Sequence, residues 1–405
     1  MKILLRSRLQ DFTSTYTWPT SYSLNNINRF GIVSMSITTE PILTNTTEGI
    51  SDVALNITSG FSYWSVFPDP NIFKFPRLAS YPLPECPVEW GSYVKDTLYP
   101  LTIEWYSPFL CACAYFVIFL WLNKIVKKRQ IAVFKKGNPD AHDIPKRLPP
   151  APIAFSKTPA FKYLVLLHNV FLCVFSLWSF LGVTMNIHHT RTERIPSIVS
   201  SQLNEASSAA SSGWDNFVYS ICDLNNGILL DHDGFKGLNF YAYWFYMSKY
   251  YEMIDTVIIL MKGRQAMFLQ IFHHAGAVLC MWTGARFASP PCWIFVVFNS
   301  CVHTVMYFYY TLCCLHFPVP VKFKKSLTSF QIIQFIIGAC VISSHQFMNY
   351  FDLDSGEYKN CVPDIEKHLS IICNVWFCIF LTYLFRQFFV QSYQKKLKKL
   401  QKKID

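Results

Sequence analysis

The chain has 405 residues, of which 52% are hydrophobic and only 15% are charged, and its mean hydropathy is +0.23. A soluble globular domain carries about 25% charged residues, so this composition excludes an ordinary soluble protein and predicts a polytopic membrane protein. The formal net charge of +11 does not indicate a nucleic-acid partner, because the basic residues gather in particular loops, as membrane topology requires.

Residues 1–95 are polar, rich in Ser and Thr and interrupted by Pro, so we expect a disordered tail there. The tail carries N-glycosylation sequons at Asn45 and Asn56, which predict glycosylation if it is lumenal. We therefore divide the chain into this tail, a membrane domain over residues 96–393, and a basic tail over residues 394–405.

Seven stretches of mostly apolar residues follow the tail, each close to the length of about 20 residues that a helix needs to span a bilayer. We therefore predict an all-α membrane protein with seven transmembrane helices. Charged residues interrupt the third stretch, and histidines interrupt the fourth. The expected spans are 101–123, 161–186, 239–261, 267–286, 292–315, 329–350 and 369–391.

Lysine and arginine are concentrated in alternate loops, which predicts the orientation of the spans. They follow the first, third and fifth spans and fill the tail after the seventh, whereas the other loops contain fewer. An odd number of crossings then places the N-terminus in the lumen and the C-terminus in the cytosol. Lys402 and Lys403 match a dilysine signal for retrieval to the endoplasmic reticulum, although a basic tail can contain such a pair by chance.

The 14 cysteines contain no CxxC pair and no zinc-ligand spacing, so we expect no metal site from them. Most lie within the apolar stretches, where a cysteine is a small packing residue. Cys222 and Cys361 instead flank the lumenal ends of spans. Because the lumen is oxidising, we expect a disulfide between these two residues.

Four clusters of polar residues interrupt the spans in order along the chain. Polar groups are costly in lipid and by default indicate a functional site, although hydrogen bonding between helices is the alternative. Their spacing of three and four residues places each cluster along one helix face. The clusters are Lys249, Glu252, Asp255 and Thr256; Gln270, His273 and His274; Asn299, His303, Met306, Tyr307 and Tyr310; and Thr328, Gln331 and Gln334.

Taken in this order, K-x-x-E-x-x-D-T, x-x-x-H-H, N-x-x-x-H-x-x-M-Y-x-Y-Y and T-x-x-Q-x-x-Q resemble the motifs of the ELO-type fatty acid elongases, over residues 100–395. The resemblance implies an enzyme of the endoplasmic reticulum that condenses malonyl-CoA with an acyl-CoA. The products are CO2, CoA and a 3-oxoacyl-CoA two carbons longer. It also implies an acyl tunnel between the helices, no cofactor, and cooperation with a ketoacyl-CoA reductase, a dehydratase and an enoyl reductase.

One position departs from the family pattern. Gln270 stands where most members have His, and glutamine can neither titrate nor act as a nucleophile. In this respect the chain is similar to the polyunsaturated-acyl elongases of lower eukaryotes.

The clusters suggest roles in a condensation. We expect His273 to accept the acyl group as an acyl-imidazole, oriented by Asp255 and Glu252, because a neutral imidazole can attack a thioester. His303, with His274, would assist the second half of the reaction. Donors are then needed for the enolate formed by decarboxylation. The candidates are Gln270, Asn299, Tyr307 and Tyr310, with Lys249, Gln331 and Gln334 in support, while Lys262, Arg264, Lys322, Lys324 and Lys325 are expected to face the CoA phosphates.

Two other classes of protein remain as alternatives. A membrane di-iron desaturase or hydroxylase also has x-x-x-H-H boxes, but it needs more histidines in such boxes, and the 11 histidines here are mostly dispersed. A seven-helix receptor would explain a glycosylated outer tail. The polar clusters, however, gather near the predicted cytosolic ends of the spans, away from a lumenal ligand pocket.

Overall fold

The computed structural model describes residues 62–78, 80–88, 91–139, 143–145, 148–202, 213–352 and 354–394. The expected glycosylation sites at Asn45 and Asn56, and the dilysine pair at Lys402 and Lys403, lie outside these residues.

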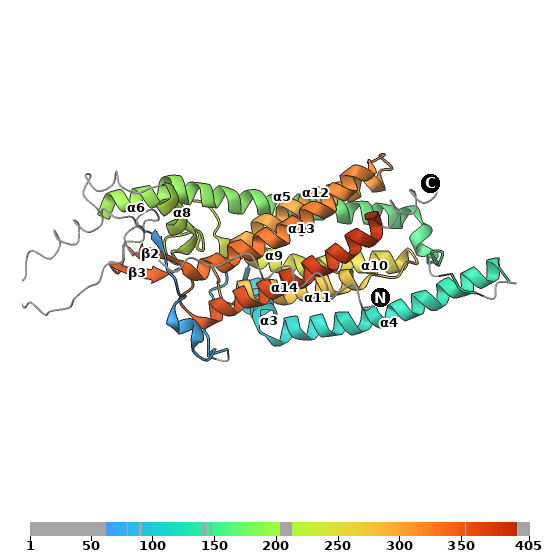
Figure 1. Cartoon of the computed structure of the whole chain (residues 1–405), viewed down its shortest axis with the longest axis horizontal. Coiled ribbons are helices and arrows are strands. Elements are labelled where there is room, and N and C mark those ends of the chain that lie inside the picture. The colour runs from blue at the N-terminus through green and yellow to red at the C-terminus, as the bar shows by residue number, and fades with distance from the viewer. Residues whose placement is uncertain are drawn as a thin grey trace, which may run out of the picture. The chain divides into compact units, whose positions relative to one another are not determined.

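Long helices lying side by side dominate the described residues (Figure 1). Five helical segments among these residues are long and apolar enough to cross a membrane, so the chain is a multi-pass membrane protein. These segments are Tyr106–Gly137, Pro159–Ser201, Cys292–Cys314, Val321–Phe347 and Ile365–Tyr393.

Two of the seven expected spans do not meet that criterion. One is divided into α9 (Leu238–Glu252) and α10 (Ile254–Met261), and the other is α11 (Phe268–Arg286). Most residues of α9 and α11 are buried by the surrounding helices, and a helix enclosed by protein does not need an apolar sequence throughout. The count of seven spans therefore stays a prediction.

The long helices are arranged so that the polar clusters face one another. Contacts run from α4 to α11, then to α14, α13, α12 and α5, while α9 packs against α11, α12 and α5. Their bounds are α4 (Tyr106–Gly137), α5 (Pro159–His189), α12 (Cys292–Cys314), α13 (Val321–Ser344) and α14 (Ile365–Phe389).

A three-stranded antiparallel sheet lies at one end of the helices, which we call the sheet end (Figure 1). Its strands are β1 (Ser62–Trp64), β2 (Met348–Asp352) and β3 (Glu357–Asn360), in the order β1-β2-β3, with Tyr63 opposite Asn349. The sequence analysis did not predict this sheet. It placed a span over 329–350, whereas α13 begins at Val321 and ends at Ser344, which leaves the last residues of that stretch for β2.

Part of the expected disordered tail packs against the sheet end. Besides the pairing of β1, the Arg77 side chain contacts the buried carboxylate of Glu366 at 3.3 Å. The guanidinium group of Arg286, at the end of α11, donates to the carbonyl oxygens of Tyr81 and Pro82 at 2.7 and 2.9 Å. These backbone acceptors replace water around a buried charge. Residues 62–78 and 80–88 thus contribute contacts to the sheet end.

The sheet end also contains a disulfide between Cys222 and Cys361, the pair named from the sequence. Cys222 ends α8 (Gly213–Cys222), and Cys361 follows β3, so the bond ties the loop between α6 and α9 to the sheet. The remaining short helical elements are η2 (Pro70–Phe73), α2 (Gly91–Tyr93), η3 (Val94–Leu98), α3 (Tyr99–Ile103), η4 (Phe155–Lys157), η5 (Thr190–Arg194), α6 (Ile195–Gln202), η6 (His345–Phe347) and η7 (Val390–Gln394).

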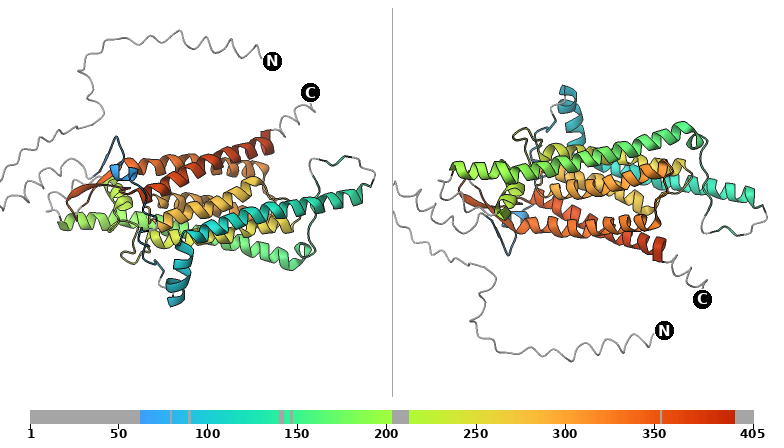
Figure 2. Two further views of the ribbon diagram at one scale, coloured as in Figure 1. Left: turned by 90° about the horizontal axis from the view of Figure 1, so that it is seen from below. Right: turned by 90° about the horizontal axis from the view of Figure 1, so that it is seen from above.

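The turn between α10 and α11 lies at the opposite end, where α4 extends past its neighbours (Figure 2). Gly263 has a φ of +71°, and a Cβ there would lie 2.0 Å from the backbone of Ala151, so the turn requires glycine. Two amide side chains of α4 hold the turn. Gln130 donates to the Gly263 carbonyl at 2.9 Å, and Asn123 bonds both the N–H and the carbonyl of Ala266 at 2.9 Å. The start of α11, which carries the histidines, is thereby fixed.

Candidate active site

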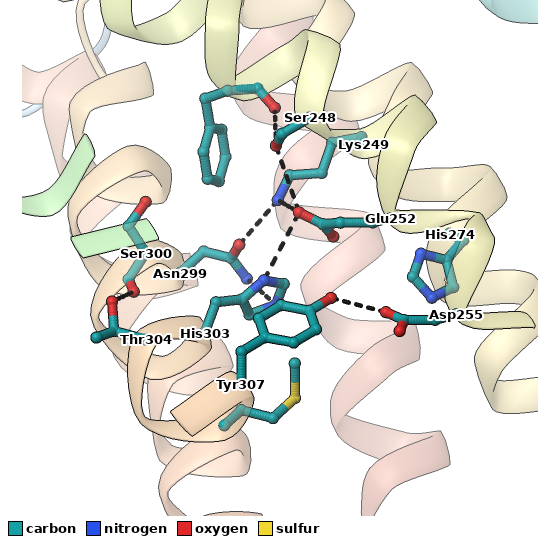
Figure 3. Close-up of polar contacts among 12 residues, drawn as sticks. Ser248, Lys249, Glu252, Asp255, His274, Asn299, Ser300, His303, Thr304 and Tyr307 are labelled. Atoms are coloured by element: carbon teal, nitrogen blue, oxygen red, sulfur yellow. Dashed lines mark hydrogen bonds and ion pairs between the residues drawn. The ribbon is translucent and has the colours of Figure 1, made fainter. Parts of the chain in front are cut away.

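A break at Met253 divides the first polar cluster into two networks. Met253 donates its backbone N–H to Tyr250 at 3.3 Å, and Thr256 donates to Met253 at 3.1 Å, which are the i to i−3 bonds of a tightened turn. Glu252 and Asp255 were expected on one helix face with shared partners. The structure instead gives them separate partners: Glu252 pairs with Lys249 and faces His303, whereas Asp255 accepts from Tyr307 (Figure 3).

Lys249 and Glu252 form an ion pair inside the protein. The Nζ atom of Lys249 lies 2.7 Å from Glu252 Oε1, and each residue is only 2% exposed. Lys249 also donates to Asn299 Oδ1 at 3.1 Å and lies over the Phe245 ring. A buried charge of this kind is tolerated only when it is paired and hydrogen-bonded.

The ion pair determines where the proton of His303 lies. Lysine can only donate, so the Asn299 side chain must turn its oxygen toward Lys249 and its amide nitrogen toward His303. That nitrogen lies 3.2 Å from His303 Nε2, which therefore accepts. The ring proton of neutral His303 is then on Nδ1, which faces Glu252 Oε1 at 3.7 Å (Figure 3).

His274 is held by the glutamine that departs from the family pattern. Gln270 Nε2 lies 3.2 Å from His274 Nε2 and 3.5 Å from the hydroxyl of Thr256, which in turn bonds Tyr115 at 2.7 Å. His274 is buried, and its Nδ1 has no hydrogen-bond partner among the described residues. Gln270 thus acts as an orienting group for an imidazole.

His273 differs from the other two imidazoles. Neither of its ring nitrogens has a hydrogen-bond partner within the described ranges, and its ring lies 6.4 Å from that of His303 and 6.2 Å from that of Phe377. Asp255 and Glu252 do not orient it as expected, because Asp255 bonds other residues and Glu252 is turned toward Lys249 and His303. His273 of α11 and His303 of α12 nevertheless lie close together, and the ring nitrogens of His273 have no hydrogen-bond partner among the described residues.

Asp255 connects three helices. Its Oδ1 lies 3.0 Å from His168 Nε2 of α5, and its Oδ2 accepts a hydrogen bond of 2.7 Å from the phenol of Tyr307 on α12. Tyr307 was expected to donate to an enolate, but its only proton is directed at Asp255. The sequence analysis did not select His168. The rule that identified His273, a polar residue inside an apolar span, applies equally to it.

A cavity of about 400 Å³ lies among these groups. His273, His274, His303 and Tyr310 contribute to its wall, and so does Gln331, which also contacts the sulfur of Met306 at 3.4 Å. A second, apolar pocket of about 30 Å³ continues toward Met281 and Phe377. Both are lined by His273, Asn299, Gln334 and Phe335, so these four residues form the boundary between the two pockets.

The basic residues expected at the CoA phosphates are only partly brought together. Lys262 and Lys324 line the large cavity, whereas Arg264, Lys322 and Lys325 do not. Lys325 instead lies over the ring of Phe389 at 5.8 Å. In the part of the chain that the structure describes, no three His, Cys, Asp or Glu side chains are grouped to hold a metal ion.

Comparison with known proteins gives a consistent family match. The ELO family model, described as the GNS1/SUR4 family, matches residues 100–401. The chain is 29% identical over 231 residues to fatty acid elongase A of Dictyostelium discoideum, which covers 56% of this chain and 71% of that protein.

Two further relatives come from other lineages. Fatty acid elongase 2 of Trypanosoma brucei brucei is 30% identical over 186 residues, which is 46% of this chain and 66% of the relative. Very long chain fatty acid elongase 7 of Rattus norvegicus is 35% identical over 157 residues, which is 37% of this chain and 51% of the relative. No solved structure matches the chain.

Proposed function

Because the chain belongs to the ELO family, we propose that this fatty acid elongase condenses malonyl-CoA with a long-chain acyl-CoA, giving a 3-oxoacyl-CoA two carbons longer, CO2 and CoA. The observation that carries the proposal is that His273 of α11 and His303 of α12 lie close together, with rings 6.4 Å apart, at the wall of one cavity. The family match does not favour a desaturase, a hydroxylase or a receptor.

His273 is the proposed nucleophile. Its nitrogen lone pair attacks the thioester carbon, the carbon–sulfur bond breaks, and CoA leaves with the proton that the imidazole loses. This assignment is supported by the free nitrogens of His273, since His303 and His274 are each engaged by an amide side chain. The acyl-imidazole then waits for the second substrate.

The second half of the reaction joins the acyl group to a two-carbon unit. Malonyl-CoA loses CO2, the resulting enolate attacks the acyl carbon, and the departing imidazole of His273 takes up one proton. His303, whose ring is held by Asn299 and faces Glu252 at 3.7 Å, would lie beside this carbon. Tyr310, Asn299 and Gln270 stay as proposed donors to the enolate, whereas Tyr307 is committed to Asp255.

The two pockets suggest how the substrates are arranged. The large cavity extends to Lys262 and Lys324, which we propose bind the CoA phosphates, and Arg264, Lys322 and Lys325 would add to the field around them. The acyl chain would enter the apolar pocket beyond His273. At about 30 Å³ that pocket has the volume of one water molecule in the liquid. A long chain therefore requires its aromatic side chains to move.

We further propose that the enzyme works without a cofactor in the endoplasmic reticulum membrane, with its N-terminus lumenal and its C-terminus cytosolic. The product would pass to a ketoacyl-CoA reductase, a dehydratase and an enoyl reductase. A panel of saturated and polyunsaturated acyl-CoAs would identify the substrates, because Gln270 makes a polyunsaturated chain the first to test.

The purified protein in liposomes should convert acyl-CoA and labelled malonyl-CoA into labelled 3-oxoacyl-CoA. Acyl-CoA alone should release CoA in a burst of one equivalent and leave an acyl group on His273, detected by peptide mass spectrometry. His273→Ala should abolish the burst, and His303→Ala should retain the burst but block condensation. His188→Ala, an exposed histidine at the sheet end, is the matched control. Condensation at the wild-type rate by His273→Ala would refute the nucleophile.

A further inference from the structure

His168 lies outside all four polar clusters, yet it contacts one of them directly. It is 4% exposed within α5, in a stretch that otherwise reads as an apolar membrane span. Its Nε2 lies 3.0 Å from Asp255 Oδ1, and the other Asp255 oxygen accepts the phenol proton of Tyr307 at 2.7 Å. Three side chains from α5, α10 and α12 are thus joined in a row.

The hydrogen bond to Asp255 determines which ring nitrogen of His168 carries a proton. A carboxylate can only accept hydrogen bonds, so with Asp255 as the acceptor His168 Nε2 is the donor. Its Nδ1 is buried and has no partner in the described part of the chain, and its ring packs on Tyr251 at 5.2 Å. His168 therefore makes one polar contact, and that contact is with Asp255.

The row leads toward the site of the proposed condensation. Asp255 and Tyr307 both line the large cavity, whereas His168 is not among its lining residues. The Tyr307 ring meets the His303 ring edge to face at 5.5 Å, one helical turn along α12. An Asp255 carboxylate that lost its His168 donor would be free to rotate, and the phenol bonded to its other oxygen would rotate with it.

We propose that His168 is a positioning residue of the condensation: it fixes Asp255, and through Asp255 it fixes the Tyr307 phenol that supports His303. This inference rests on the proposed function. A hydrogen bond to a charged partner is stronger than one between neutral groups, so the loss of the His168 donor should change the rate and not only the packing.

Two amide substitutions separate the hydrogen bond from the packing. In His168→Gln the amide nitrogen reaches the place of Nε2 and can donate to Asp255, whereas in His168→Asn it reaches only the place of Nδ1. We expect His168→Asn to lower kcat about tenfold, equal to about 1.4 kcal/mol, with KM nearly unchanged. His168→Gln should keep kcat within about threefold of the wild type, since the charge-assisted bond is retained.

A second background tests whether His168 acts through Tyr307. In Tyr307→Phe the phenol is absent, so adding His168→Asn should lower kcat by no more than about twofold further, because residues that act as one unit are not additive. A general packing defect would instead lower kcat by the same factor of about ten in the wild-type protein and in Tyr307→Phe. The amount of folded, monodisperse protein is measured for every variant by size exclusion in detergent.

The outcomes distinguish the two claims. If wild-type protein does not condense malonyl-CoA with any acyl-CoA, the proposed function fails and the role of His168 fails with it. If the wild type is active but His168→Asn equals it, or His168→Gln is as slow as His168→Asn, only the positioning role is overturned. A full additive loss in the Tyr307→Phe background overturns it as well.

Discussion

Replacing Lys249 by Met tests the physical basis of the site most directly. The change removes the cation from Glu252, which is 2% exposed and whose Oε2 has no partner among the described residues. What is left near Glu252 Oε1 is the Ser248 hydroxyl at 3.4 Å and His303 Nδ1 at 3.7 Å. Breaking a buried ion pair by removing one partner costs about 3–5 kcal/mol, so Lys249→Met should be strongly destabilised.

For a double variant we expect stability to be regained. Lys249→Met with Glu252→Gln leaves no buried charge, and replacing both members of such a pair is often close to neutral. The double variant should therefore recover more than half of the lost stability. It should not recover activity, because the neutral amide no longer provides the carboxylate that faces His303.

The assay is the thermal unfolding midpoint of each purified variant in detergent, at one heating rate because unfolding of such proteins is often irreversible. Lys236→Met is the matched control, since Lys236 pairs with Asp231 at the surface, where an ion pair contributes about 0–1 kcal/mol. We expect the unfolding midpoint to be highest in the wild type, followed by the Lys236→Met control, then the double variant, and to be lowest in Lys249→Met. A single variant as stable as the control, or a double variant no better than the single, would refute the reasoning.

Three further predictions concern the rest of the fold. Cys222→Ser opens a disulfide that closes a separation of 139 residues, so the free energy of unfolding under oxidising conditions should fall by up to about 5 kcal/mol in the chain-entropy model, and the thermal midpoint should match that of the reduced wild type. Gly263→Ala should destabilise the α10–α11 turn by at least about 1 kcal/mol and lower condensation, measured as midpoint and rate, because its φ is +71°. Burial raises the pKa of Asp352, but hydrogen bonds from Lys359 and Ser355 outweigh it and leave the pKa below the ordinary 3.8. Its contribution should be present above pH 3.8 and lost as the pH falls through the lower folded-state pKa, and Lys359→Met should flatten that acid loss.

The sequence predicted the long helices well because bilayer thickness fixes the length of an apolar stretch. The expected span over 292–315 is observed at Cys292–Cys314, and that over 161–186 at Pro159–His189. The sheet was missed for a physical reason. The expected span over 329–350 ran into the first residues of β2, and the partner strand β1 lies far away in the chain, so no local pattern indicates the pairing.

Helical periodicity tells which residues share a helix face. In the structure Lys249 contacts Asn299 of α12, and the rings of His273 and His303 lie 6.4 Å apart. Periodicity does not tell which partner each side chain meets. Asp255 was expected to orient His273, yet it meets His168, 87 residues away, because the chain turns at Met253 and no periodic pattern encodes that turn.

The turn at Met253 also explains why one short motif can serve two purposes. In a continuous helix, Glu252 and Asp255 would be three residues apart on one face, and two carboxylates at that spacing repel each other. The tightened turn separates them, so Glu252 neutralises Lys249 while Asp255 accepts from His168 and Tyr307. Each carboxylate then has its own set of partners: Lys249 and His303 for Glu252, and His168 and Tyr307 for Asp255. The imidazoles of His168, His274 and His303 each use one ring nitrogen in a hydrogen bond to a neighbouring side chain, whereas neither ring nitrogen of His273 has a partner among the described residues, and His273 lines the cavity.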